Sequence, residues 1–144
     1  MYNNGYPLMT SFFTLFLTLM HWSVPGPSLV VQVNGVNSAN GNVFVGLYRM
    51  EDEWPVFGKQ YQGKIVKAVK GKNTIYFNNL PPGMYAVATY HDINANKKLD
   101  KNMFGMPIEL YGFSNDARAT FSAPEFEDAK FELKSSKTIT IQIK

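Results

Sequence analysis

The segment YHDINANKKLD, residues 90–100, holds a dense set of side chains that could bind a metal ion or move a proton. Four oxygen-bearing side chains stand at relative positions 1, 3, 5 and 9 of its loop: Asp92, Asn94, Asn96 and Asp100. Alternate side chains of a tight loop converge on one point, and oxygen ligands suit Ca²⁺. With the backbone carbonyl of Lys98 at position 7, the spacing predicts a candidate calcium loop.

Two positions depart from a calcium loop of the EF-hand type. Position 6 is Lys97, where the sharp turn requires glycine, and position 12 is Met103, where a bidentate glutamate belongs. The alternative is a loop closed by Asx turns, in which Asp and Asn side chains accept hydrogen bonds from nearby backbone N–H groups. We favour the Asx-turn interpretation without a cofactor, and Ca²⁺ stays as the alternative.

His91 precedes this loop, and it is the only histidine beyond the N-terminal segment that contains His21. A catalytic role needs a nucleophile and an orienting partner within hydrogen-bond reach. Asp92 and Asp116 could orient His91 as the base of a hydrolase, but no nucleophile motif such as G-x-S-x-G or H-E-x-x-H is present. We therefore expect a structural histidine and a protein that is not an enzyme, with the hydrolase as the less favoured alternative.

A mixture of aromatic rings and amides follows the loop and suggests a ligand-binding surface. Ring faces stack on apolar parts of a ligand, while polar groups fix its orientation. We expect this loop face to use seven residues for binding: His91, Asp92, Asn102, Glu109, Tyr111, Phe113 and Asn115. The same rings could instead close the end of a hydrophobic core, which is the more common use of such residues.

Composition excludes several classes of function. The 144-residue chain has no cysteine, so disulfides, thiolate metal sites and a cysteine nucleophile are absent. The net charge is only +3, and the closest approach to a basic stripe is Lys64, Lys67, Lys70 and Lys72. A solvated strand face explains these lysines, and we expect no nucleic-acid partner.

The N-terminal region carries no charged side chain before Arg49. Residues 8–20 read LMTSFFTLFLTLM, a run that is apolar on all sides and short for a membrane span. This pattern predicts an export segment over residues 1–26, followed by one domain over residues 27–144. If the segment is not removed, it becomes a membrane anchor, and we expect membrane contact only through it.

Alternation of apolar and polar residues predicts short strands along the rest of the chain. In residues 43–48, Val43, Val45 and Leu47 share one face and the intervening residues share the other. The apolar run 84–91 predicts a central strand, whereas residues 92–129 form a long segment that would cap the sheet or carry function. These patterns predict an all-β fold, an antiparallel β-sandwich of seven to eight strands.

Residues 80–133 read LPPGMYAVATYHDINANKKLDKNMFGMPIELYGFSNDARATFSAPEFEDAKFEL. Their order and spacing resemble the bacterial DUF2141 family, through motifs such as LPPGxY, HDxNxN and YGFSN. The resemblance implies export to the periplasm or cell surface and a transthyretin-like (prealbumin-like) β-sandwich, and it implies no known activity. We therefore expect a non-catalytic binding or structural module of the cell envelope, with an envelope protein, a glycan or a small molecule as its partner.

Overall fold

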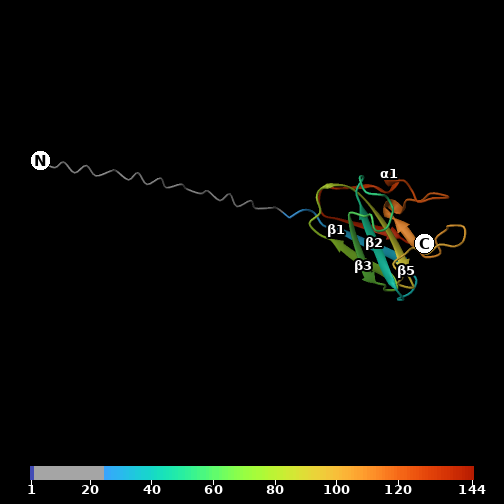
Figure 1. Cartoon of the computed structure of the whole chain (residues 1–144). Coiled ribbons are helices and arrows are strands. Elements are labelled where there is room, and N and C mark those ends of the chain that lie inside the picture. Colours follow the sequence, from blue (N-terminus) through green and yellow to red (C-terminus); the bar gives the residue numbers. More distant parts are fainter. Residues whose placement is uncertain (2–24) are drawn as a thin grey trace.

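Eight β-strands carry the fold in this computed structural model, which describes residue 1 and residues 25–144 (Figure 1). They form a three-stranded sheet of order β4-β1-β8 and a five-stranded sheet of order β3-β2-β5-β6, with β7 also paired to β5. Two facing sheets of eight strands confirm the predicted sandwich-like all-β fold. The strand bounds are β1 Leu29–Val36, β2 Asn42–Tyr48, β3 Gln62–Lys67, β4 Gly71–Phe77, β5 Gly83–Asp92, β6 Tyr111–Phe113, β7 Phe131–Leu133 and β8 Lys137–Gln142.

The predicted export segment, residues 1–26, falls mainly on residues 2–24, which lie outside the described residues. Next to them, the Gly26 N–H donates to the side-chain oxygen of Asn79 at 2.6 Å. No helix in the described part of the chain is long and apolar enough to cross a bilayer.

β1 and β8 run parallel, which corrects the prediction of a wholly antiparallel sandwich. β1 pairs antiparallel with β4 on its other side. The Lys137 N–H donates to the Ser28 carbonyl at 2.9 Å, so β1 and β8 begin at the same end of their sheet. A short connection carries the chain from β7 in the larger sheet to β8 in the smaller one, and this crossover sets the direction of β8.

β5 is the central strand of the larger sheet, as the apolar run predicts. β2 pairs along one edge of it, while β6 and β7 share the other edge. The predicted long segment, residues 92–129, is therefore not one loop. It contains β6, the 3-10 helix η1 (Ser114–Asp116) and the one-turn helix α1 (Phe126–Ala129).

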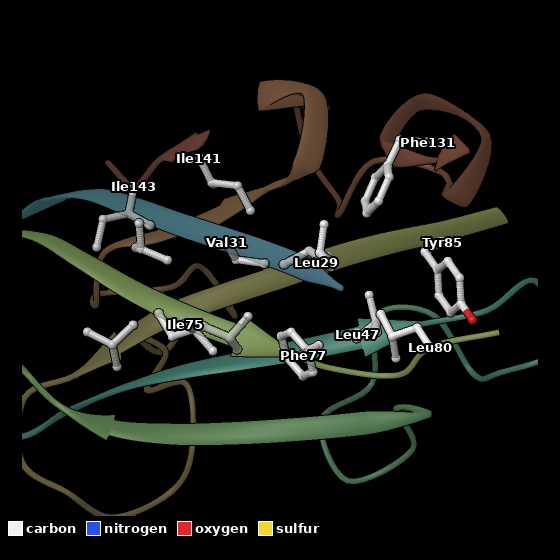
Figure 2. Packing of buried hydrophobic residues seen from close by; sticks show 14 of the residues in the cluster. Leu29, Val31, Leu47, Ile75, Phe77, Leu80, Tyr85, Phe131, Ile141 and Ile143 are labelled. Atoms are coloured by element: carbon white, nitrogen blue, oxygen red, sulfur yellow. The ribbon is translucent and has the colours of Figure 1, made fainter. Parts of the chain in front are cut away.

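The two sheets enclose an aliphatic core. Val43, Val45 and Leu47 of β2 belong to this core, which confirms the face assigned from their alternation. Figure 2 shows side chains from both sheets packed together, among them Leu29 of the smaller sheet and Leu47 of the larger one. We call the side of the larger sheet that covers this core its inner face. Burial of apolar surface here contributes about 25 cal/mol per Å² to the stability of the fold.

The outer face of the larger sheet is covered by loops and aromatic rings. Ala86 and Ala88 of β5 lie in this second cluster with Tyr48, and their small side chains leave room for large rings. The Trp54 ring lies 5.2 Å from the Tyr48 ring, and its Nε1–H donates to the carbonyl of Pro124 at 2.8 Å. Two loops that are far apart in the sequence are thus joined over this face.

Candidate functional site

The loop that follows β5 is closed by its own hydrogen bonds. The two carboxylate oxygens of Asp92 accept the backbone N–H groups of Asn96 and Lys97 at 3.0 and 2.8 Å. The side-chain oxygens of Asn94 and Asn96 accept the N–H groups two residues further on, at 3.1 and 2.8 Å. These are the contacts that the Asx-turn interpretation predicts.

The oxygen ligands proposed for calcium do converge, but nitrogen donors stand among them. The side-chain amides of Asn94 and Asn96 donate to the two oxygens of the Asp100 carboxylate at 2.6 and 2.9 Å. A bound cation would have to replace these contacts. Among the described residues, no three Asp, Glu, His or Cys side chains group as metal ligands. Lys97 has a φ of 64°, so position 6 takes the left-handed conformation that glycine normally supplies.

Glu109 and Asn102 hold the base of the projecting loop, residues 101–108. The Glu109 carboxylate accepts the N–H groups of Ile93 and Asp100 at 2.9 and 3.0 Å. The Asn102 side-chain oxygen accepts the N–H groups of Phe104 and Met106 at 2.9 and 3.1 Å. Both predicted ligand-binding side chains therefore bind backbone, which fixes the conformation of the loop.

His91 points into the inner face and is fully buried. Its Nε2 lies 2.8 Å from the Asn40 carbonyl, to which it must donate, because a carbonyl only accepts. Its Nδ1 is buried and has no hydrogen-bond partner in the part of the chain that the structure describes. The carboxylates of Asp92 and Asp116 accept backbone N–H groups instead, the latter that of Gln142 at 3.0 Å. Among the described residues, His91 thus contacts no orienting carboxylate, and its side chain is not accessible from solvent.

Ser114 and Asn115 lie at the edge of β5, where the strand passes from pairing with β7 to pairing with β6. The Val87 N–H falls between the parts of β5 that pair with β7 and β6, and it donates to the Ser114 hydroxyl oxygen at 2.9 Å. That hydroxyl donates to the Ala129 carbonyl at 2.5 Å. The Asn115 amide donates to the carbonyls of Asp128 and Lys130 at 3.2 and 2.8 Å. Asn115 therefore fastens η1 to the segment around α1.

Tyr111 and Phe113 lie on the outer face, on the other side of the sheet from His91. Tyr111 pairs in register with Tyr90, and Phe113 packs in the outer cluster. The guanidinium carbon of Arg118 lies 5.3 Å from the centre of the Tyr111 ring. The seven side chains predicted to bind a ligand thus do not form one continuous surface, because neighbouring residues of a strand point to opposite faces.

These two rings line a groove of about 770 Å³ over the outer face. Its walls come from three segments: residues 55–57, residues 97–107 and residues 119–123. Five aromatic rings and three lysines line it: Phe57, Phe104, Tyr111, Phe113 and Phe121, with Lys97, Lys98 and Lys101. Among the described residues that line the groove there is no Asp, Glu or His. We call it the aromatic groove.

The ring of Tyr90 supports one wall of the aromatic groove. Its centre lies 4.6 Å from that of Phe57, and the tyrosine is fully buried. Burial raises the pKa of the Tyr90 phenol to about 12, and the carboxylates of Asp92 and Glu109 add to the shift. The phenol therefore stays neutral at physiological pH, and its hydroxyl has no hydrogen-bond partner within residues 25–144.

The model of a protein family described as "Uncharacterized protein conserved in bacteria (DUF2141)" matches residues 31–142. The chain belongs to the DUF2141 family. The match begins within β1 and ends with β8, so it spans the loop after β5 and every residue that lines the aromatic groove. Comparisons with curated proteins and with solved structures find no match.

Sequence reasoning on this DUF2141 protein missed most of the groove. It selected Tyr111 and Phe113 but not Phe57 or Phe104, because these rings belong to separate segments. Lys97 and Lys98 were considered as positions of a calcium loop and not as part of an anion-binding site. A signal was nevertheless present: residues 97–107 hold three lysines and, besides Asp100, no acid.

Proposed function

We propose that this protein is a non-catalytic binding module of the bacterial cell envelope. It takes a small organic ligand, with a flat apolar part and an anionic group, into the aromatic groove. The observation that supports this most directly is the lining itself, which combines five rings with three lysines and no carboxylate among its described residues. The envelope location rests on the apolar residues 8–20, which have the length of an export signal.

The size and chemistry of the groove support a ligand of this class. Binding sites for small molecules commonly measure about 300–1,000 Å³ and combine aromatic walls with a few polar groups. In the part of the chain that the structure describes, Lys97, Lys98 and Lys101 make no ion pair. Their ammonium groups are therefore available to an anion, while Tyr111 and Phe113 offer ring surface.

The groove lining favours binding over catalysis. General acid–base chemistry needs a titratable group beside the reacting atom, and nucleophilic catalysis needs a base beside the nucleophile. The hydroxyl groups in the lining belong to Thr89, Thr120, Ser122 and Tyr111. Thr89 donates to the Phe44 carbonyl at 2.7 Å and Ser122 to the Ala123 carbonyl at 3.0 Å, so neither contacts a base.

Two fluorescent probes of similar shape test this proposal. Anilinonaphthalene sulfonate is an anionic aromatic compound, and phenylnaphthylamine is its neutral counterpart. We expect the anion to bind saturably at one site, and to bind about tenfold more weakly after joint Lys97→Gln, Lys98→Gln and Lys101→Gln substitution, while the neutral probe is little affected. Fluorescence titration measures both affinities.

The matched control removes the same charge elsewhere. Joint Lys64→Gln, Lys67→Gln and Lys70→Gln substitution lowers the net charge equally but leaves the groove unchanged. This variant should bind both probes like the unchanged protein. If both triple variants lost affinity for the anionic probe equally, or if neither probe bound saturably, the groove would not be a site for anionic ligands.

A calcium-stabilised module is the second candidate function. Two observations favour it: the Asp100 carboxylate meets both Asn94 and Asn96, and Lys97 already adopts the turn conformation of a calcium loop. Rotation of the two amides would direct their oxygens toward a cation held by Asp92 and Asp100. The ion would organise the loop and do no chemistry.

Thermal unfolding in excess EDTA and then in millimolar Ca²⁺ tests this second function. An ion at one hundred times its Kd stabilises the folded state by about 2.7 kcal/mol. We expect that gain to disappear in Asp100→Asn, which retains the size of the side chain. An unchanged melting temperature with and without Ca²⁺ would leave a loop held only by its own hydrogen bonds.

A further inference from the structure

Five large apolar side chains stand in solvent on two loops at the mouth of the aromatic groove. Met103 is 90% exposed, Phe104 81%, Met106 62%, Ile108 65% and Phe121 99%. Exposed apolar groups gathered in this way mark an interaction surface, whereas single ones need no explanation. We call these five residues the apolar tip.

The apolar tip is held outward by the backbone contacts beneath it. Lys101 and Pro107 form an antiparallel bridge, and the Asn102 side chain binds two N–H groups of the turn that they enclose. Gly105 turns the chain with a φ of 78°. Figure 1 shows residues 101–108 and the segment around residue 121 projecting from the body of strands as separate loops. The side chains are therefore presented at protruding ends and not on a flat face.

The exposed charge beside the apolar tip is positive. Lys97, Lys98 and Lys101 are exposed and, among the described residues, unpaired. The acids of the same region point inward: Asp92 and Glu109 are buried and accept backbone N–H groups. Asp100, the third, receives the two asparagine amides.

We propose that the apolar tip docks this protein on an anionic lipid surface. The apolar side chains enter the boundary between head groups and acyl chains, and the three lysines contact lipid phosphates. Stable protein partners usually bury about 800 Å² on each side, which requires a broad complementary face that two protruding loops do not supply. Docking would add a membrane contact independent of the N-terminal segment, and it would bring the mouth of the aromatic groove to the lipid surface.

A single fluorescent label tests this contact in the full chain. The protein has no cysteine, so Met103→Cys can be labelled at one position with an environment-sensitive fluorophore. Met103 does not line the groove, so the label leaves the proposed ligand site open. Tyr76→Cys is the matched control, because Tyr76 is 57% exposed on β4 of the smaller sheet. Both variants keep residues 8–20, so attachment through that segment affects both alike.

With vesicles of phosphatidylcholine and phosphatidylglycerol, we expect a blue shift and quenching by spin-labelled lipid at position 103 and not at position 76. Joint Lys97→Gln, Lys98→Gln and Lys101→Gln substitution should weaken partitioning of the tip about a hundredfold, from about fivefold for each lysine near an anionic surface. The Lys64, Lys67 and Lys70 control should leave it within a fewfold. Joint Phe104→Ser and Ile108→Ser substitution should abolish the shift.

Several results would overturn the proposal. The label at position 103 could remain in water, or the label at position 76 could respond equally. Partitioning could also be equal into vesicles with and without phosphatidylglycerol. A shift that grows with protein concentration without vesicles would instead identify a second copy as the occupant. Saturable probe binding in the groove with no docking would refute the lipid contact alone, and docking with no probe binding would refute the ligand site alone.

Discussion

The two faces of the larger sheet are covered in different ways. The inner face meets a second sheet, and branched aliphatic side chains such as Val45 and Leu47 fill the space between them. The outer face meets loops, and large rings such as Trp54 and Phe113 lie over it. Two sheets with regular pleats can interdigitate without gaps. Loops cannot repeat that spacing, and the groove of about 770 Å³ lies where their coverage is incomplete.

Buried polar groups without a hydrogen-bond partner lie on both faces. On the outer face, the buried hydroxyls of Tyr48 and Tyr90 find no hydrogen-bond partner among residues 25–144. On the inner face, the Tyr85 hydroxyl donates to the Pro81 carbonyl at 2.7 Å, whereas His91 Nδ1 has no partner among the described residues. The inner face therefore lies within the packed core, while the outer face leaves the space into which we propose that a ligand binds.

The largest expected effect is a loss of stability from a substitution in the inner core, compared with a substitution at the groove that should affect only binding. Leu47→Ala removes a fully buried side chain from the inner core and should cost about 2–5 kcal/mol of unfolding free energy in urea denaturation. Phe121→Ser removes a ring that is almost wholly in solvent, and it should change stability by at most about 0.5 kcal/mol. The serine variant should nevertheless weaken probe binding in the groove. Similar stability losses would contradict the proposed division between the faces.

A second test concerns the hydroxyl that bridges the gap in the β5 edge. Ser114→Ala leaves the Val87 N–H buried without an acceptor and should cost about 1–3 kcal/mol. Ser122→Ala is the control, because this exposed hydroxyl contacts only the neighbouring carbonyl of Ala123. Its unfolding midpoint should not move. A Ser114 variant as stable as the control would show that water replaces the hydroxyl.

Alkaline pH should destabilise the outer face through Tyr90. Its folded pKa of about 12 lies above the usual value of 10.0, so the contribution of the neutral phenol is fully present below pH 10 and is lost as pH rises toward 12. Tyr90→Phe should reduce the fall in stability over that range. At pH 7 it should be neutral or stabilising by up to about 1 kcal/mol, because it removes an unpartnered hydroxyl.

Urea denaturation at pH 7 and at several values between pH 10 and pH 12 measures both effects. Tyr76→Phe, on the exposed surface of β4, is the control and should show the same alkaline loss as the unchanged protein. If Tyr90→Phe loses stability between pH 10 and pH 12 as steeply as Tyr76→Phe does, groups other than Tyr90 cause the alkaline loss.

The smallest expected effect lies in the loop beside the groove. Lys97→Gly should stabilise the fold by up to about 1 kcal/mol, because Lys97 has a positive φ that glycine adopts without strain. Lys98→Gly, at a residue without positive φ, should destabilise by a similar or smaller amount through the greater freedom of the unfolded chain. Thermal melts in EDTA compare them. The opposite order would indicate that Lys97 contributes contacts that outweigh its backbone strain.

Local patterns in the sequence determined the strands, their faces and the closure of the loop. The alternation of Val43, Val45 and Leu47 with Phe44, Gly46 and Tyr48 predicted both faces of β2, because side chains in a strand alternate with a period of two. The Asx turns around Asp92 and Asn96 were also predicted, since they join residues only two to five positions apart. The match to the DUF2141 family followed from the order and spacing of such motifs.

Tertiary structure alone decided the direction of β8, the burial of His91 and the existence of the groove. The sequence-based prediction placed His91 and Tyr111 on one surface because it treated the segment between them as a single loop. Their separation depends on the register that pairs Tyr111 with Tyr90. The groove joins residues 55–57, 97–107 and 119–123, which no local pattern connects. Periodicity reports the neighbours of a residue along the chain, whereas a site between loops depends on which distant segments the sheets bring together.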